Sequence, residues 1–270
     1  MSPTPAPGAA RTRRPLRGSA LLGASVLLAS GCDARQLYED TLDIGWPKPV
    51  TEQGELMYEL WLGTAAAGLV VGVVVWALMA WAGFRYRKKG EELPRQVRYN
   101  LPVEVLYTTL PFVVLAVLFY YTVVVQNEVN DVTEDPDVTI GVVGFQWNWQ
   151  FNYDEEGLQV TGAPGEPAEL VLPTDRRIRF VETSPDVIHS FWVPEFLFKR
   201  DVVPGRTNTF ELTINQEGRW VGRCAELCGE KHNRMNFYVS AVSPEEYDAF
   251  VRESQARGSV NAPPPAGDPS

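Results

Sequence analysis

The stretch Arg219–Val242, RWVGRCAELCGEKHNRMNFYVSAV, decides how the second half of this chain is organised. Two short apolar segments, RWVGRC and NFYVSAV, flank residues Cys224–Met235, which hold two thiols, an imidazole and a thioether. The flanking segments have the composition of β-strands, so the sequence predicts two strands joined by a ligand loop, Cys224–Met235. Thiolate, imidazole and thioether together favour copper over zinc, and hard cations such as calcium match them poorly.

Soft ligands are scarce in the rest of the chain. His189 is the only other histidine, and the third cysteine, Cys32, lies far away in an N-terminal apolar run. A single histidine on an apolar strand is more often a core residue than a ligand. Here the ligand loop needs a further ligand, and a late Cys/His/Met loop with an upstream histidine is typical of blue-copper sites. The second cysteine departs from that pattern, and two thiolates four residues apart could bridge two metals.

Three other interpretations of the ligand loop stay open at this point. A Cys2His2 zinc site lacks the usual spacing here and leaves Met235 without a role. A redox dithiol of a membrane-anchored copper chaperone would come with a thioredoxin-like βαβ pattern, which the sequence does not show. A plain disulfide is the simplest alternative for an exported domain. Composition and spacing favour copper among these.

The region from residue 137 reads as short strands separated by turn residues. The candidate strands are VTIGVVG (138–144), FQWNWQFNY (145–153), ELVLP (169–173), RIRFVE (177–182), VIHSFWV (187–193), TNTFELTI (207–214), RWVGRC (219–224) and NFYVSAV (236–242). Many short strands at this spacing indicate an all-β Greek-key sandwich or barrel. Ser243 is a candidate N-cap for a terminal helix over 244–257, and the Pro/Gly/Ala-rich tail 258–270 is expected to be disordered.

Two apolar runs, 60–82 and 101–125, precede the β-region and contain one formal charge, Glu104. At ~1.5 Å per residue each run is long enough to cross a hydrocarbon core of ~30 Å. The loop 83–100 between them carries six lysines and arginines, and no further one follows before Arg176. The positive-inside rule therefore predicts a multi-pass protein of the plasma membrane, with loop 83–100 cytoplasmic and the C-terminal domain external. Glu104 is either a functional acid or an interfacial one.

Residues 11–32, RTRRPLRGSALLGASVLLASGC, have the layout of a secretory signal. Their last five residues resemble a bacterial lipoprotein box, which implies cleavage before Cys32 and lipidation of its thiol. The expected divisions are a signal peptide (1–31), an external segment (32–56), a transmembrane hairpin (57–126), a β-domain (127–243), a helix (244–257) and a tail (258–270). The net charge of −10 argues against nucleic acid and suits a basic protein partner.

Four motifs, in order along residues 50–255, resemble cytochrome c oxidase subunit 2. They are the start of the second apolar run, Asn100–Val105; the aromatic segment Gly144–Trp149; the histidine strand Asp186–Pro194; and the ligand loop. The resemblance implies a cupredoxin-like domain with a binuclear copper A centre. It implies that Cys224 and Cys228 bridge two coppers, one of which also binds His189 and Met235, while the other binds His232 and the backbone carbonyl of Glu226.

The resemblance also implies roles for residues around the centre. The Glu226 carboxylate would help to bind a magnesium ion shared with subunit 1, Asp186 would support the copper site, and Trp147 would receive electrons. Glu104 would lie at the mouth of a proton pathway. The implied function is electron transfer from a c-type cytochrome, free or belonging to a bc complex, through copper to haem in subunit 1 of a proton-pumping oxidase. Haem is expected only in that partner subunit.

Related chains with other functions are disfavoured by the same residues. A quinol-oxidase subunit 2 would keep the hairpin and β-domain but lack the four copper-ligating side chains of the ligand loop, Cys224, Cys228, His232 and Met235. Nitrous-oxide reductase would need a large additional domain. A copper-delivery protein that binds one Cu(I) reversibly through the two thiols is the alternative from a different functional class.

Overall fold

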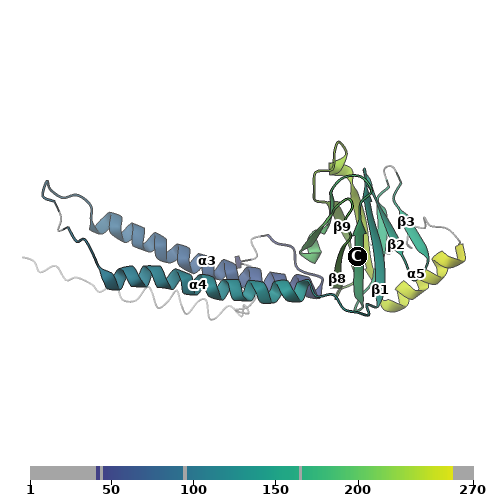
Figure 1. The fold of residues 1–270 in the computed structure, drawn as a ribbon, viewed down its shortest axis with the longest axis horizontal. Coiled ribbons are helices and arrows are strands. Elements are labelled where there is room, and N and C mark those ends of the chain that lie inside the picture. Colours follow the sequence, from purple (N-terminus) through teal and green to yellow (C-terminus); the bar gives the residue numbers. More distant parts are fainter. Residues whose placement is uncertain (1–40, 43–44, 94–95, 164–165, 258–270) are drawn as a thin grey trace, which may run out of the picture. The chain divides into compact units, whose positions relative to one another are not determined.

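The computed structural model describes residues 41–42, 45–93, 96–163 and 166–257. The expected signal peptide 1–31, Cys32 and the tail 258–270 lie outside these described residues. All of the elements below belong to one compact unit that begins at Gly45. Figure 1 shows its two long helices, its β-domain and its C-terminal helix.

Two long helices follow from the two apolar runs of the sequence. Helix α3 spans Glu52–Arg85 and helix α4 spans Leu101–Val129. With 34 and 29 residues they exceed the ~20 residues that a membrane crossing requires. The Thr51 hydroxyl caps the first helix by accepting the N–H of Gly54 at 2.9 Å. Both helices are long and apolar enough to cross a membrane.

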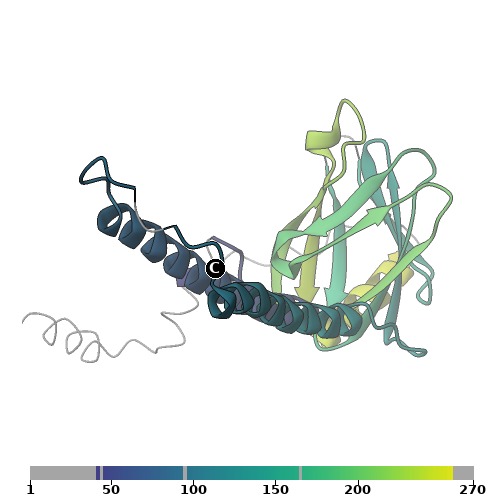
Figure 2. The same cartoon turned by 60° about the vertical axis from the view of Figure 1, so that its left-hand side comes forward.

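Among the described residues, ten strands form two five-stranded sheets. The two sheets face each other (Figure 2). The first sheet has the order β3-β2-β1-β5-β8, with β1 Val138–Phe145, β2 Asn148–Tyr153, β3 Leu158–Thr161, β5 Arg177–Thr183 and β8 Asn208–Thr213. The second has the order β4-β10-β9-β6-β7, with β4 Ala168–Pro173, β6 His189–Val193, β7 Phe198–Val202, β9 Gly218–Cys224 and β10 Asn236–Val242. The pairs β1–β5 and β4–β10 are parallel and the other pairs are antiparallel. The predicted fold class, two apolar helices before an all-β sandwich, is confirmed.

An aromatic core fills the space between the sheets because alternate residues of the strands point inward. On β1 buried and half-buried residues alternate over the whole strand. The central ring is Phe237, which stacks on Phe191 at 4.9 Å between centroids and meets Trp149 edge-on at 5.3 Å. All three rings are fully buried. Gly222 on the neighbouring strand makes this possible, because a Cβ there would lie 2.0 Å from the Phe237 ring.

The sequence prediction of the strands was wrong in two respects. Strands β3 and β7 were missed, because they have only 4 and 5 residues and β7, FKRDV, is rich in charge. The predicted strand 145–153 is also broken at its start. Phe145 pairs with Asn148, so Gln146 and Trp147 form a tight turn between β1 and β2. The apolar alternation Phe145-Trp147-Trp149 continues through this turn, which is why the sequence pattern does not reveal it.

Helix α5, Pro244–Arg257, follows the last strand. Ser243 Oγ accepts the N–H of Glu246, and the Glu246 carboxylate accepts the N–H of Ser243, both at 3.3 Å. This reciprocal pair is a capping box, which explains why the helix begins where it does.

Glu182 on β5 is fully buried, and neither carboxylate oxygen has a hydrogen-bond partner among the described residues. Burial raises its pKa from 4.5 to about 9, although the charge of Arg200 opposes the shift. Because the folded-state pKa lies above the unfolded one, this group's contribution to stability is complete below pH 4.5. It is lost as the pH rises through 9, with a slope of about 1.4 kcal/mol per pH unit in between.

Glu182→Gln should therefore raise the melting temperature near pH 8 and flatten its decrease between pH 5 and pH 9. Thermal unfolding of the metal-free chain in detergent measures this effect. The exposed Glu217→Gln is the matched control, and it should follow the wild type. An unchanged pH profile for Glu182→Gln would show that this carboxyl titrates alike in the folded and unfolded states.

Candidate metal centre

The ligand loop connects two neighbouring strands, β9 and β10, at one end of the second sheet. Cys224 is the last residue of β9, and its N–H donates to the carbonyl of Met235 at 3.0 Å, which closes the neck of the loop. Strand β6 pairs with β9 at Phe191 and Cys224. His189, the first residue of β6, is therefore brought beside the loop by strand pairing and not by nearness in sequence.

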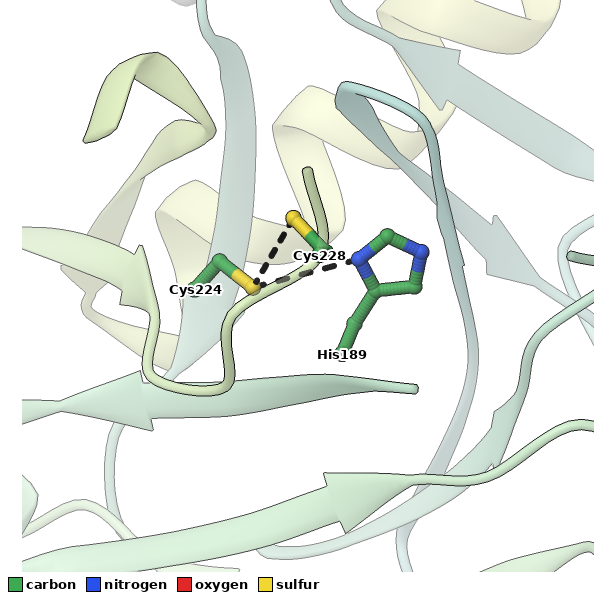
Figure 3. Close-up of side chains that lie close together, drawn as sticks. All are labelled: His189, Cys224 and Cys228. Atoms are coloured by element: carbon green, nitrogen blue, oxygen red, sulfur yellow. Dashed lines mark hydrogen bonds between the residues drawn. The ribbon is translucent and has the colours of Figure 1, made fainter. Parts of the chain in front are cut away.

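The two thiols and the upstream imidazole converge on one point (Figure 3). Cys224 Sγ lies 3.8 Å from Cys228 Sγ and 3.9 Å from His189 Nδ1. All three residues are buried, and their candidate ligand atoms lie within 4.8 Å of one another. No disulfide joins the two cysteines. This group could hold a metal ion.

Three further donors complete the set that the sequence analysis named. Cys228 Sγ lies 3.6 Å from His232 Nδ1 and 3.7 Å from Met235 Sδ. The backbone carbonyl oxygen of Glu226 lies 3.2 Å from Cys224 Sγ. Four candidate donors from one loop and one strand thus gather around the two cysteine sulfurs, which brings the set to six.

Asp186 fixes the orientation of the His189 ring. Its Oδ1 lies 2.9 Å from His189 Nε2, on the side of the ring away from the sulfurs. Burial by itself would raise the pKa of Asp186, but the hydrogen bonds from the Gln146 N–H and His189 outweigh it and lower that pKa. A carboxylate on one ring nitrogen leaves the other free as a ligand, which is the usual arrangement of metal-binding histidines.

The two thiols differ in acidity. Burial tends to raise the pKa of Cys224, but hydrogen bonding to His189 and backbone groups lowers the pKa below its usual value. Burial and the nearby charge of Cys224 raise the pKa of Cys228. Ionisation of one thiol therefore opposes ionisation of the other, and a cation between the sulfurs would be needed to make both thiolates stable side by side.

The other predicted residues are placed differently. Trp147 touches the centre from the β1–β2 turn, where its Nε1 donates to the Cys228 carbonyl at 3.3 Å and the Lys231 Nζ lies 5.5 Å from its ring centroid. The Glu226 carboxylate is paired with Lys199 at 2.8 Å. Glu104 lies on α4, away from the ligand loop in the chain, where its carboxylate accepts the Asn100 N–H at 2.8 Å.

Sequence reasoning missed several residues that contact this site, among them Gln146 and Lys199. Gln146 donates from its side chain to the Cys228 carbonyl, and Lys199 neutralises the Glu226 carboxylate. Gln146 lies in the aromatic segment that the sequence analysis noted, so its position beside Trp147 was the available signal. Lys199 lies on the missed strand β7, and nothing in the local pattern indicated it.

The fold and the site together define a class of protein. It has two membrane-length helices followed by a β-sandwich that holds a buried cluster of thiols, imidazoles and a thioether at one end. The profile of a family described as "Cytochrome C oxidase subunit II, periplasmic domain" matches residues 166–242.

Relatives extend this match to most of the chain. "Probable cytochrome c oxidase subunit 2" from Streptomyces avermitilis is 40% identical, covering 93% of this chain and 92% of the relative. "Cytochrome c oxidase subunit 2" from Mycobacterium tuberculosis is 37% identical, covering 95% and 88%. The chain belongs to the cytochrome c oxidase subunit 2 family, whose members are parts of an oxidoreductase complex. Among solved structures, the periplasmic domain of subunit II (CoxB) of Bradyrhizobium japonicum is 30% identical with a TM-score of 0.43, covering 47% of this chain and 100% of that one.

Proposed function

We propose that this chain is the electron-accepting subunit of a proton-pumping cytochrome c oxidase, with a binuclear copper centre in its external domain. The observation that carries the proposal is the pair of buried sulfurs 3.8 Å apart with an imidazole Nδ1 beside each of them. When bound, the copper pair would supply one-electron chemistry between a c-type cytochrome and haem in subunit 1. Oxygen would be reduced to water in that subunit.

The spacing of the donors suits two copper ions, which the sulfurs of Cys224 and Cys228 would both help to hold. His189 and the Glu226 carbonyl lie beside Cys224, whereas His232 and Met235 lie beside Cys228. One proposed ligand set is His189 with Met235, and the other is His232 with the Glu226 carbonyl. Each set combines one donor that lies beside Cys224 with one that lies beside Cys228. Each copper would therefore be held near both sulfurs. Thioether and thiolate donors select copper over harder metals.

The chain's own residues would keep the centre rigid and dry. The ligands project from paired strands and one short loop. Met235 is fully buried within the hydrophobic core, and the fully buried His189 ring meets Trp149 edge-on at 6.3 Å between centroids. Trp149 fastens the end of the loop, because its indole N–H donates to the Met235 carbonyl at 3.3 Å. Small changes in ligand position between oxidation states favour fast electron transfer, and a packed core of this kind resists such changes.

The remaining roles follow from the proposed complex. The Glu226 carboxylate would contribute to a magnesium site at the contact with subunit 1, and it would first have to leave its ion pair with Lys199. The two helices would place the β-domain on the external face of the cell membrane, with loop 83–100 inside. Cleavage and lipidation at Cys32 would add a second anchor, and the mass of the mature N-terminal peptide tests that step.

Membership of the complex can be tested directly. The chain, tagged at its C-terminus and purified from its own membranes, should bring with it a haem-containing subunit and cytochrome c oxidase activity. Purification of the chain alone, with the haem protein left in the membrane fraction, would contradict the proposal.

Trp147→Ala should slow electron uptake without removing copper. The indole lies against the Cys228 backbone and is half-buried, so it offers a short route from the surface to the sulfurs. We expect the rate of reduction by a c-type cytochrome to fall about ten-fold or more, equivalent to ~1.4 kcal/mol in the barrier. Stopped-flow reduction of the purified oxidase measures this rate. Trp220→Ala is the matched control, since Trp220 packs against Phe196. Equal rates for both variants would reduce Trp147 to a packing residue.

Glu104→Gln should lower turnover while leaving the copper spectrum unchanged. The carboxylate lies in the first turn of α4, where it would start a proton pathway into subunit 1. Glutamine can still accept the Asn100 N–H, so the start of the helix should be kept, but it cannot carry a proton. Oxygen consumption by the purified oxidase is the measurement. Turnover equal to that of the wild type would leave Glu104 with a capping role alone.

A further inference from the structure

Gln146 makes two short hydrogen bonds to two different parts of the metal centre. Its backbone N–H donates to Asp186 Oδ2 at 2.7 Å, and its side-chain Nε2 donates to the carbonyl of Cys228 at 2.7 Å. These partners are 40 and 82 residues away in the sequence. The roles proposed above do not use Gln146.

Each of the two hydrogen bonds acts on a proposed ligand side chain indirectly: one through the carboxylate of Asp186, the other through the main chain of Cys228. The backbone bond holds the carboxylate of Asp186, whose other oxygen lies 2.9 Å from His189 Nε2. The side-chain bond holds the main chain of Cys228 itself. Gln146 lies in the β1–β2 turn of the first sheet, whereas His189 and the ligand loop belong to the second sheet. Gln146, in a turn of the first sheet, therefore connects the His189 side and the Cys228 side of a metal site whose ligands come from the second sheet.

The turn and the loop fit closely at this point. Gly229 has a φ of +123°, a conformation that favours glycine. A Cβ at Gly229 would lie 3.2 Å from Gln146 Nε2 and 3.2 Å from the indole nitrogen of Trp147. The missing side chain lets both groups approach the Cys228 carbonyl, which has two lone pairs and can accept both hydrogen bonds.

We propose that Gln146 is a positioning residue that holds the ligand loop against the His189 strand and so sets the spacing of the two sulfurs. It acts through the Cys228 main chain and through Asp186, and it does not itself touch a metal. The indole of Trp147 in the same turn donates to the same carbonyl at 3.3 Å, so the Gln146 amide, at 2.7 Å, makes the shorter of the two hydrogen bonds that join the turn to the loop at Cys228. Removing the amide donor should let the loop open more often, whether or not metal is present. The part of this inference that concerns copper rests on the proposed function.

Gln146→Met tests the first part without metal. Methionine has a similar length but no donor, and the backbone N–H to Asp186 remains. Gln150→Met is the matched control, because the Gln150 amide donates to Asn152 on the same strand, away from the loop. Hydrogen exchange is measured on the full-length, copper-free chain in detergent, for peptides covering 225–235. Exchange about ten-fold faster than in the wild type and the control is expected, since exchange there requires local opening. A rate equal to the control overturns the inference.

Copper release tests the second part. With the chain loaded with copper, a chelator should remove the metal about ten-fold faster from Gln146→Met than from Gln150→Met. Faster loop exchange with unchanged copper release would overturn the claim that Gln146 positions the ligands for metal. If the wild type itself takes up no copper pair, the proposed function fails, while hydrogen exchange still decides whether Gln146 holds the loop. Gln146→Asn, whose shorter side chain should not reach the Cys228 carbonyl, is the second variant if Gln146→Met does not fold.

Discussion

Cys228→Ser should abolish the binuclear centre while leaving the β-domain folded. A serine hydroxyl stays protonated at neutral pH and is a hard donor, so it cannot bridge two coppers as a thiolate does. The purified variant should bind at most one copper per chain, lose the shared-electron spectrum and lose cytochrome c oxidation. Serine is close to cysteine in size, so the 3% exposed side chain should be replaced with little repacking. Copper content and steady-state oxidation of cytochrome c by the assembled oxidase are the measurements.

Ala225→Ser provides the control for Cys228→Ser, because it adds a hydroxyl to the same loop and keeps both thiols. It should retain two coppers and most of the activity. Normal oxidation of cytochrome c by Cys228→Ser would sink the assignment of the ligand loop as the electron-accepting site.

Gly222→Ala should destabilise the β-domain by about 1–3 kcal/mol, the usual cost of overpacking a core. The new Cβ would lie 2.0 Å from the Phe237 ring, which cannot easily yield because it is stacked on Phe191 and packed against Trp149. The same strain reaches the metal centre, since Trp149 holds the Met235 carbonyl. Thermal unfolding of the metal-free chain should show a lower melting temperature, and loaded copper should be lost sooner.

Gly141→Ala on β1 is the control for this prediction. A Cβ there would meet Asn152 at 3.3 Å, a contact that a small shift of a half-buried polar side chain can relieve. Its melting temperature should stay close to that of the wild type. Equal melting temperatures for Gly222→Ala and Gly141→Ala would mean that the Phe237 ring has room to move, contrary to the packing described above.

Much of this architecture could be predicted from the sequence because its signals are local. Two apolar runs predict two long helices from length and composition alone, and the alternation of apolar residues predicts most strands. The ligand loop stands out because Cys224, Cys228, His232 and Met235 are rare, soft donors within twelve residues. His189 could be added as a ligand because it is the only histidine outside the ligand loop.

Other features could not be predicted because they depend on contacts between distant segments. The alternation of Phe145, Trp147 and Trp149 continues through a tight turn, and only the pairing of Phe145 with Asn148 shows where β1 ends. Gln146 reaches a carbonyl 82 residues away. Lys199 lies on a charged edge strand with no apolar pattern, yet it pairs with Glu226. Contacts of this kind are set by the tertiary fold, and the periodic pattern of apolar residues along one segment does not predict them.

Copper stoichiometry combined with electron paramagnetic resonance tests the central claim most directly. The full-length chain in detergent is loaded with copper, freed of excess metal and measured in its oxidised form. Two coppers per chain that share one unpaired electron are the predicted result. A single copper with a localised electron, or a spectroscopically silent Cu(I) that a mild chelator removes, would contradict it and would favour copper delivery over electron transfer.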